Sequence, residues 1–187
     1  METYQRKEPH FSLCGLNCCL CPRFHTDGDS RCPGCGGEGF SEKHPTCAVV
    51  TCSKKHGNRN VEFCYQCAEY PCQKYQTDGA KDSFISYKNV LKNMGDAQLD
   101  LQKYLEILRK KYQYLKILLD SYNDGKSKGL YCLAVNLLPI NEIKDIFSEI
   151  DKFSKNKAVG QKEMAKEVAR LMAEKARELN IDLKLRK

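Results

Sequence analysis

Apolar residues in the second half of the chain recur every three or four positions, which is the period of an α-helix that buries one face. The longest stripe consists of Leu101, Leu105, Leu108, Tyr112, Leu115, Leu119 and Tyr122. It predicts one long helix, with Asp96 as its N-cap and a turn at residues 123–125 as its end. A shorter stripe, which begins at Phe84 and reaches Met94, predicts a preceding helix that ends at Gly95.

Three more helices are predicted beyond this turn. Residues 130–138 are apolar on all sides, which fits a buried helix or a buried strand, and we expect a helix with Pro139 after it. Two amphipathic stripes follow, one through Ile143, Ile146, Phe147, Ile150 and Phe153 and the other through Met164, Val168, Leu171, Met172 and Leu179. Both helices should pack on the long one. The alternating tail from Ile181 to Arg186 fits a short edge strand or a frayed end.

The first 79 residues lack such stripes. They are rich in turn-forming residues, as in segment 27–39, and only short helices are expected, near residues 45–55 and 71–76. A segment of this kind buries little apolar surface, and domains below about 80 residues commonly add metals or disulfides for stability. We therefore expect a mostly α protein. A small irregular Cys-rich metal-binding module, residues 1–79, precedes a helical bundle-like domain, residues 80–187.

Cysteine usage sets the chemistry of the first part. Eleven of the twelve cysteines lie between Cys14 and Cys72, and Cys132 alone lies beyond them. The first ten residues contain no apolar stretch, so we expect no secretory signal and a cytoplasmic location. Thiols are kept reduced in that compartment, which favours metal ligation over disulfides.

Three CxxC spacings occur among these cysteines, at 18–21, 32–35 and 64–67. Two intervening residues let a tight turn aim both sulfurs at one ion, a geometry that zinc sites use repeatedly. Because tetrahedral zinc takes four ligands, ten thiols would fill two Cys₄ sites and leave two over. Spacing alone leaves open which clusters share a site. We expect about two structural zinc ions in a protein that serves as a binding or scaffolding module.

The net charge of +7 comes from the helical part. Residues 1–80 carry nine Lys or Arg against nine Asp or Glu, whereas residues 81–187 carry 22 against 15. Nucleic-acid binding needs a concentrated basic face, which the Cys-rich part lacks. We therefore expect a protein partner, if any, rather than nucleic acid. No segment is apolar enough to predict a membrane-spanning helix.

The cysteine clusters follow one another as CGLNCCLCPRF, CPGC, Cys47 with Cys52, and FCYQCAEYPC. This order resembles the cysteine-rich family called domain of unknown function 3795, over residues 14–72. The resemblance implies ten metal ligands: Cys14, Cys18, Cys21, Cys32, Cys35, Cys47, Cys52, Cys64, Cys67 and Cys72. It leaves out Cys19 and Cys132, the latter expected to be a buried small apolar residue. It implies no activity.

An iron–sulfur cluster is the alternative cofactor, in a protein of redox or enzymatic chemistry. Cys14, Cys18 and Cys21 form CxxxCxxC with a proline directly after it, as in many cluster-binding loops. No catalytic constellation is recognisable, so the sequence leaves open whether the protein is an enzyme. The other polar candidates are expected to be loop or solvated residues, not assigned as ligands: His25, His44, His56, Glu62 and Glu69.

Overall fold

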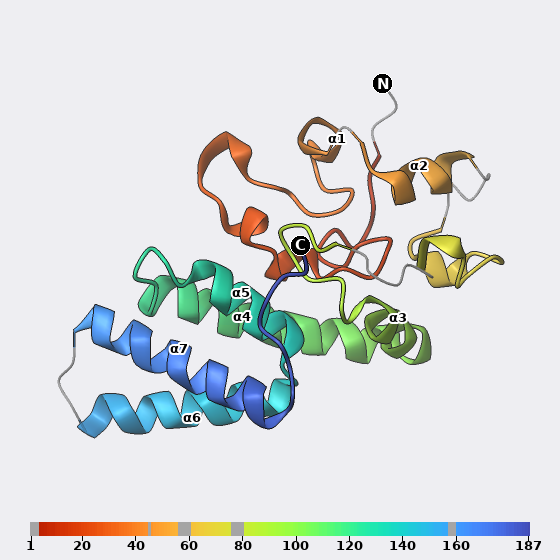
Figure 1. The fold of residues 1–187 in the computed structure, drawn as a ribbon. Helices are drawn as coiled ribbons and strands as arrows, with labels where there is room; N and C mark the ends of the chain where they lie inside the picture. Colours follow the sequence, from red (N-terminus) through yellow and green to blue (C-terminus); the bar gives the residue numbers. More distant parts are fainter. Residues whose placement is uncertain (1–3, 45, 56–60, 76–80, 157–159) are drawn as a thin grey trace. The chain divides into compact units, whose positions relative to one another are not determined.

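The computed structural model of the chain describes residues 4–44, 46–55, 61–75, 81–156 and 160–187. Regular structure in this part is helical, and its β-structure is limited to an isolated bridge between Phe11 and Asn17 (Figure 1). The α-helices are α1 (Phe40–Lys43), α2 (Ala48–Lys55), α3 (Val90–Leu99), α4 (Leu101–Ser121), α5 (Lys128–Leu137), α6 (Ile140–Asn156) and α7 (Gln161–Glu178). Short 3₁₀-helices cover Cys18–Leu20, Pro22–His25, Gly28–Ser30, Cys64–Gln66 and Gln73–Tyr75. The predicted mostly α class is confirmed.

The chain divides into two compact units. The first contains Met1–Leu105 with Arg186–Lys187, and the second contains Glu106–Leu185. The long helix α4 begins in the first unit and continues in the second. The boundary predicted after residue 79 falls at residues outside the described part of the chain, so it stays a prediction.

The first unit is built around a core of aromatic and aliphatic side chains with little regular structure beside it. Phe11 is fully buried, and its ring centroid lies 5.1 Å from that of Phe63 and 4.7 Å from that of Tyr104. The Tyr104 hydroxyl donates a hydrogen bond of 2.8 Å to the side-chain oxygen of Asn17. Helix α4 thereby holds the loop that carries the first cysteines.

Helix α3 contacts the same loop through its buried face. The Asn93 side-chain amide donates to the carbonyl oxygen of Gly15 at 3.0 Å. Gly15 has φ +92°, and a Cβ there would lie 2.6 Å from the Met94 Cγ, so the position requires glycine both for its backbone and for space. The glycine of the CGLNC segment is therefore a packing requirement.

The predicted boundary between the third and fourth α-helices is wrong. Helix α3 runs through Gly95 and ends at Leu99, and Phe84 and Tyr87 precede it. The side chain of Asp100, not Asp96, caps α4 by accepting the Lys103 N–H at 3.0 Å. A helix-interior glycine costs about 1 kcal/mol, and the burial of Met94 and Ala97 on both sides of Gly95 offsets it.

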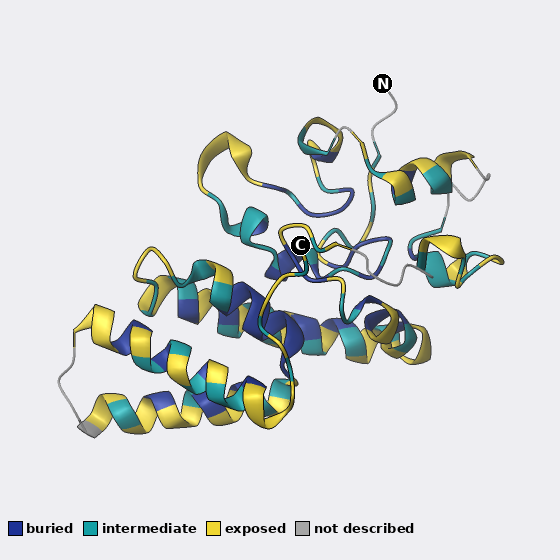
Figure 2. Ribbon diagram, in the orientation of Figure 1, coloured by how far each residue is buried: buried dark blue, intermediate teal, exposed yellow. Residues whose placement is uncertain are grey.

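The second unit consists of the predicted amphipathic helices. Every residue from 131 to 138 is buried, which confirms the helix expected there, and α5 and α6 both pack against α7. Figure 2 shows the buried and exposed faces alternating along α6 and α7. The Tyr131 hydroxyl donates to the carbonyl oxygens of Tyr122 and Ala165, at 2.9 and 3.3 Å. No described helix combines the length and apolarity needed to cross a membrane.

The tail forms no strand, and its end is bound by an ion pair within the first unit. The Arg186 guanidinium lies 2.9 Å from an Asp82 carboxylate oxygen, and the Arg186 N–H donates to the other oxygen at 2.8 Å. Burial raises the pKa of Asp82, but hydrogen bonds from Arg186 and from the Tyr87 N–H outweigh burial and lower the pKa to about 2. Asp82 is therefore stabilised as a carboxylate.

Replacing Asp82 with asparagine is expected to destabilise the first unit by about 1–2 kcal/mol near neutral pH. An aspartate whose pKa is lower in the folded state contributes its full stabilisation of the fold when the pH is above its ordinary pKa of 3.8. It loses this stabilisation as the pH falls toward 2. The difference in unfolding free energy between wild type and Asp82→Asn should therefore shrink below pH 4. Urea unfolding of both proteins across that range measures it, and Asp145→Asn, at an exposed carboxylate on α6, is the control. A difference that stays constant with pH would contradict the assignment.

Candidate metal centre

All twelve cysteines are described and carry free thiols. The ten that the sequence singled out lie in the first unit, in two groups of four and one pair beside a histidine. We name these sets the first, second and third thiol groups. Cys19 and Cys132 belong to none of them, and both are 1 % exposed. The expectation that Cys132 is a buried apolar residue is confirmed.

The second thiol group consists of Cys52, Cys64, Cys67 and Cys72, which line one partly open cavity of about 40 Å³. Cys52 comes from α2, Cys64 begins a 3₁₀-helix, and Cys72 lies near the next one. The Cys67 N–H donates to the Cys64 carbonyl at 3.0 Å, so this CxxC closes a tight turn with both cysteines at the same cavity. Three separate segments of the chain thus bring their thiols to one space.

The buried position and close spacing of these thiols raise the pKa of Cys64. Burial raises the pKa of the Cys64 thiol to about 11, and the charges of Cys72, Cys52 and Cys67 add to the increase. A hydrogen bond with the Tyr75 hydroxyl acts in the opposite direction. Without a cation, four thiolates at this spacing repel one another, whereas a dication would offset both this repulsion and the cost of burying the charged thiolates.

The first thiol group consists of Cys14, Cys18, Cys35 and Cys47. Cys18, Cys35 and Cys47 pack in one apolar cluster with Leu13 and Phe40. Burial raises the pKa of the Cys14 thiol to about 12, and the charges of Cys35 and Cys47 raise it further, whereas hydrogen bonds from Ser12 and Leu16 lower it. Burial also raises the pKa of Cys18, followed by the charges of Cys35 and Cys14. The four thiols therefore lie close enough to influence one another's ionisation.

Helix α2 and the residue just before it contribute one cysteine to each of these groups. Cys47 precedes the helix and accepts the Thr51 N–H at 2.8 Å, whereas Cys52 lies within it. Cys47 packs in the apolar cluster with Cys18 and Cys35, whereas Cys52 lines the cavity of the second thiol group. The two cysteines also line one surface pocket together, so the groups adjoin at the start of this helix.

The CPGC segment also divides its two cysteines. The Cys32 N–H donates to the Arg23 carbonyl at 2.9 Å, whereas the Cys35 N–H donates to the Pro9 carbonyl at 3.0 Å. Gly34 makes the turn between them with φ +87°, and a Cβ there would lie 2.3 Å from the Pro9 oxygen. The backbone of each cysteine is thus hydrogen-bonded to a different part of the chain, although the charges of both cysteines raise the pKa of Cys18. We assign Cys35 to the first thiol group because it packs with Cys18 and Cys47, and Cys32 to the third because it lies beside His44.

The third thiol group consists of Cys21, Cys32 and His44. The His44 Nε2 lies 3.5 Å from the Cys32 Sγ. Burial raises the pKa of Cys21, and so does the charge of Cys32, while the nearby backbone at Arg23 and Phe24 and the Arg23 charge lower it. Burial lowers the pKa of His44, and the Arg23 charge lowers it further. The neutral imidazole that results is the metal-binding form.

The other predicted histidines lie elsewhere or outside the described residues. The His25 Nε2 lies 2.7 Å from the Cys19 carbonyl oxygen, so backbone occupies that nitrogen. His56 falls among residues that the structure does not describe. The proximity of His44 to Cys32 was not foreseen, because twelve residues separate them and no spacing motif links them.

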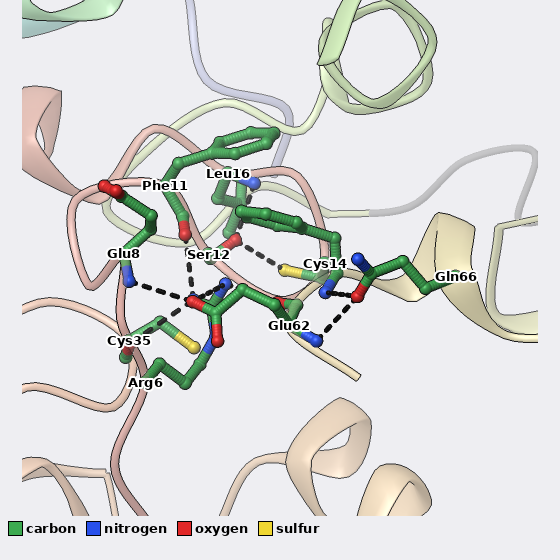
Figure 3. A network of polar contacts seen from close by, with 10 residues as sticks. Arg6, Glu8, Phe11, Ser12, Cys14, Leu16, Cys35, Glu62 and Gln66 are labelled. Atoms are coloured by element: carbon green, nitrogen blue, oxygen red, sulfur yellow. Dashed lines mark hydrogen bonds and ion pairs between the residues drawn. The ribbon is translucent and has the colours of Figure 1, made fainter. Parts of the chain in front are cut away.

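Arg6 and Glu62 form a buried network beside the first thiol group (Figure 3). The Arg6 side chain is 2 % exposed and forms an ion pair of 3.3 Å with Glu62. Its Nη1 donates to the carbonyl oxygens of Phe11 and Cys35, at 2.8 and 3.3 Å. The Glu62 carboxylate also accepts the Glu8 N–H at 2.8 Å. The expectation that Glu62 is solvated is therefore wrong, because its charge is paired with a cation that the sequence analysis did not single out.

Two buried polar atoms at this place have no hydrogen-bond partner, the Tyr4 hydroxyl and the Arg6 Nε. Burial raises the pKa of Tyr4, and the charges of Cys35 and nearby Cys47 add to that, so the hydroxyl lies near these thiols as an O–H donor. Buried donors without partners normally require a reason. Donors beside metal-bound thiolates are a recurring arrangement, in which hydrogen bonds to sulfur support the ligand.

Among the described residues, no three His, Cys, Asp or Glu side chains already surround a common point as a formed coordination site. The groups are defined by a shared cavity, a short sulfur–nitrogen distance and mutual electrostatic effects. Comparison with known proteins adds nothing to this picture: no family model, curated protein or solved structure gives a significant match to the chain. The resemblance to domain of unknown function 3795 stays a prediction.

Proposed function

We propose that this protein binds zinc through the first and second thiol groups and works as a binding or scaffolding module. The observation that carries the proposal is the cavity shared by the four cysteines of the second thiol group. Four thiolates are a common donor set of structural zinc sites. The proposal requires the sulfurs to turn toward the cavity centre when the ion binds.

The size of the cavity supports a single ion. Its volume of about 40 Å³ is a few times the ~10–15 Å³ that one water-sized particle needs. An iron–sulfur cluster brings several iron and sulfide atoms with it and needs more space. Iron–sulfur chemistry is accordingly the alternative that the experiment has to separate from zinc.

The surroundings of the first thiol group support charged thiolates there. The Arg6 guanidinium opposes the increase in the Cys35 pKa that burial causes, and the Tyr4 hydroxyl is a spare donor nearby. A zinc ion with four thiolates carries two net negative charges, so a buried cation and O–H donors beside it are favourable.

A structural role follows from the donor number. A site closed by four protein ligands leaves no coordination position for a substrate, so its ion stabilises the fold instead of reacting. The first unit has short helices and turns around its cysteines, the kind of chain that gains its folded state from metal binding. The ordered loops then form a surface for a partner, for which we propose a protein because this part of the chain has no excess of basic residues.

The test is the metal content of the full chain purified aerobically. We expect at least two zinc ions per chain by elemental analysis, without visible absorbance. Stripping the metal with a strong chelator should make residues 4–75 exchange amide hydrogens rapidly, while α6 and α7 keep their protection. A colourless protein without zinc, or a brown iron-containing protein after anaerobic purification, would refute the proposal.

A further inference from the structure

We infer that the first and second thiol groups bind their ions cooperatively, because the same backbone groups and side chains hold both of them. This inference rests on the proposed zinc binding and deepens it, since it concerns how the two sites fill. When one ion raises the affinity for the other, chains with a single ion are scarce and most chains carry either none or two.

Two hydrogen bonds join the segment of the second thiol group to the loop that carries Cys14. The Cys64 N–H donates to the Leu13 carbonyl oxygen at 2.9 Å. The Tyr75 hydroxyl donates to the Cys14 carbonyl oxygen at 3.3 Å, and Tyr75 also lines the cavity of the second group. Two consecutive residues of the loop are therefore bonded to residues at the two ends of segment 64–75.

The two thiol groups also share apolar packing. Val49, Val61 and Cys64 line the cavity of the second group. The same three side chains pack against the apolar cluster that contains Cys35 of the first group. A displacement of these side chains consequently changes the surroundings of both groups.

Helix α2 connects the groups through the backbone. Cys47 of the first group directly precedes the helix, and Cys52 of the second group lies in its second turn. Val49, which packs toward both groups, lies between them in the sequence. An ion that fixes either cysteine therefore also restricts the position of the other.

The sign of the coupling follows from the cost of ordering the chain. Helix α2 has eight residues and the 3₁₀-helix at Cys64 has three, and helices of this length do not form alone in water. The first ion to bind orders contacts that the second ion also needs. The second ion then binds with a smaller loss of conformational entropy, which raises its affinity.

Repulsion between the two loaded sites opposes this coupling, because a zinc ion with four thiolates carries two net negative charges. Each group has a cation beside it. Lys74 lines the cavity of the second group, and the Arg6 guanidinium donates to the Cys35 carbonyl oxygen at 3.3 Å. These cations and dissolved salt reduce the repulsion, so we expect the gain from ordering to dominate.

Native mass spectrometry of the full chain, stripped of metal under reducing conditions and titrated with up to two equivalents of zinc, measures the coupling. For a typical coupling of about 5–150-fold, fewer than about a third of the chains carry one ion at half loading, against about half for two equal independent sites. Tyr75→Phe removes the hydroxyl bonded to Cys14 and should raise this share. Tyr70→Phe is the matched control and should leave it unchanged, because Tyr70 lines the same cavity and contacts the Tyr75 ring.

The outcomes separate this inference from the proposed function. Two ions that bind independently, with about half of the chains singly loaded at half loading, would overturn the coupling and leave the two sites intact. A chain that binds no zinc would defeat both. Equal singly loaded shares in Tyr75→Phe and Tyr70→Phe would overturn the link through Tyr75. Circular dichroism of each zinc-loaded variant checks that it is folded.

Discussion

Replacing Cys64 with serine is expected to remove one zinc ion per chain and to unfold the segments around the second thiol group. Cys64 is one of four cysteines at the 40 Å³ cavity, and its N–H also bonds the Leu13 carbonyl at 2.9 Å. Structural zinc contributes on the order of 10 kcal/mol in small zinc-dependent domains. A whole domain is stable by only about 5–15 kcal/mol. Losing the ion should therefore destabilise this region more than losing any other single contact in it.

Elemental analysis and hydrogen exchange measure this result. The amides of Cys67, Tyr70 and Tyr75, which are hydrogen-bonded in the second thiol group, should lose protection. Amides in α6 and α7 should keep theirs. Cys132→Ala on α5 removes a buried thiol of the second unit and should leave the zinc count unchanged. An unchanged zinc count in Cys64→Ser would show that Cys64 is not a ligand.

Replacing Arg6 with alanine is expected to destabilise the first unit by about 3–5 kcal/mol, the usual cost of breaking a buried ion pair from one side. The change leaves the Glu62 carboxylate without its cation and two carbonyl oxygens, of Phe11 and Cys35, without their donor. It also removes the guanidinium that lies 5.1 Å from the Phe63 ring centroid. The loss is large because the Arg6 side chain is almost completely buried.

Denaturant unfolding of the zinc-loaded chain, followed by circular dichroism, measures this difference. Arg31→Ala is the matched control: this arginine also lies over a ring, that of Phe24, and donates to a carbonyl, but it is exposed. Its loss should cost less than 1 kcal/mol. The double variant Arg6→Met with Glu62→Gln should be less destabilised than the two single changes predict together. Equal losses for Arg6→Ala and Arg31→Ala would contradict the network.

The helices show where local pattern suffices. The expected buried helix is present as α5, which ends at Leu137, and the stripes through Ile143 and Met164 both mark the faces that pack in the second unit. The prediction of the boundary between α3 and α4 was wrong because glycine is a common residue at a helix end, and the local sequence therefore suggested that the helix ends at Gly95. Burial of Met94 and Ala97 beside it overrides that preference.

The cysteine motifs show what the local sequence pattern does not predict. The turn at Cys64 and Cys67 brings both residues to one cavity, as the CxxC spacing predicts. At Cys32 and Cys35 the same spacing accompanies a different arrangement, in which the two N–H groups bond the distant carbonyls of Arg23 and Pro9. The motif is a property of a few neighbouring residues, whereas the grouping of thiols depends on which loops meet.

The sequence by itself determined the helical class and most helix positions, since both follow from the periodicity of nearby residues. The set of ten cysteines comes from the family resemblance and stays a prediction. Only the tertiary structure decided that Glu62 pairs with Arg6 from 56 positions away, that His44 lies beside Cys32, and that Cys52, Cys64, Cys67 and Cys72 line one cavity. Such contacts form when distant loops close on a common core, and no local pattern records which of them do.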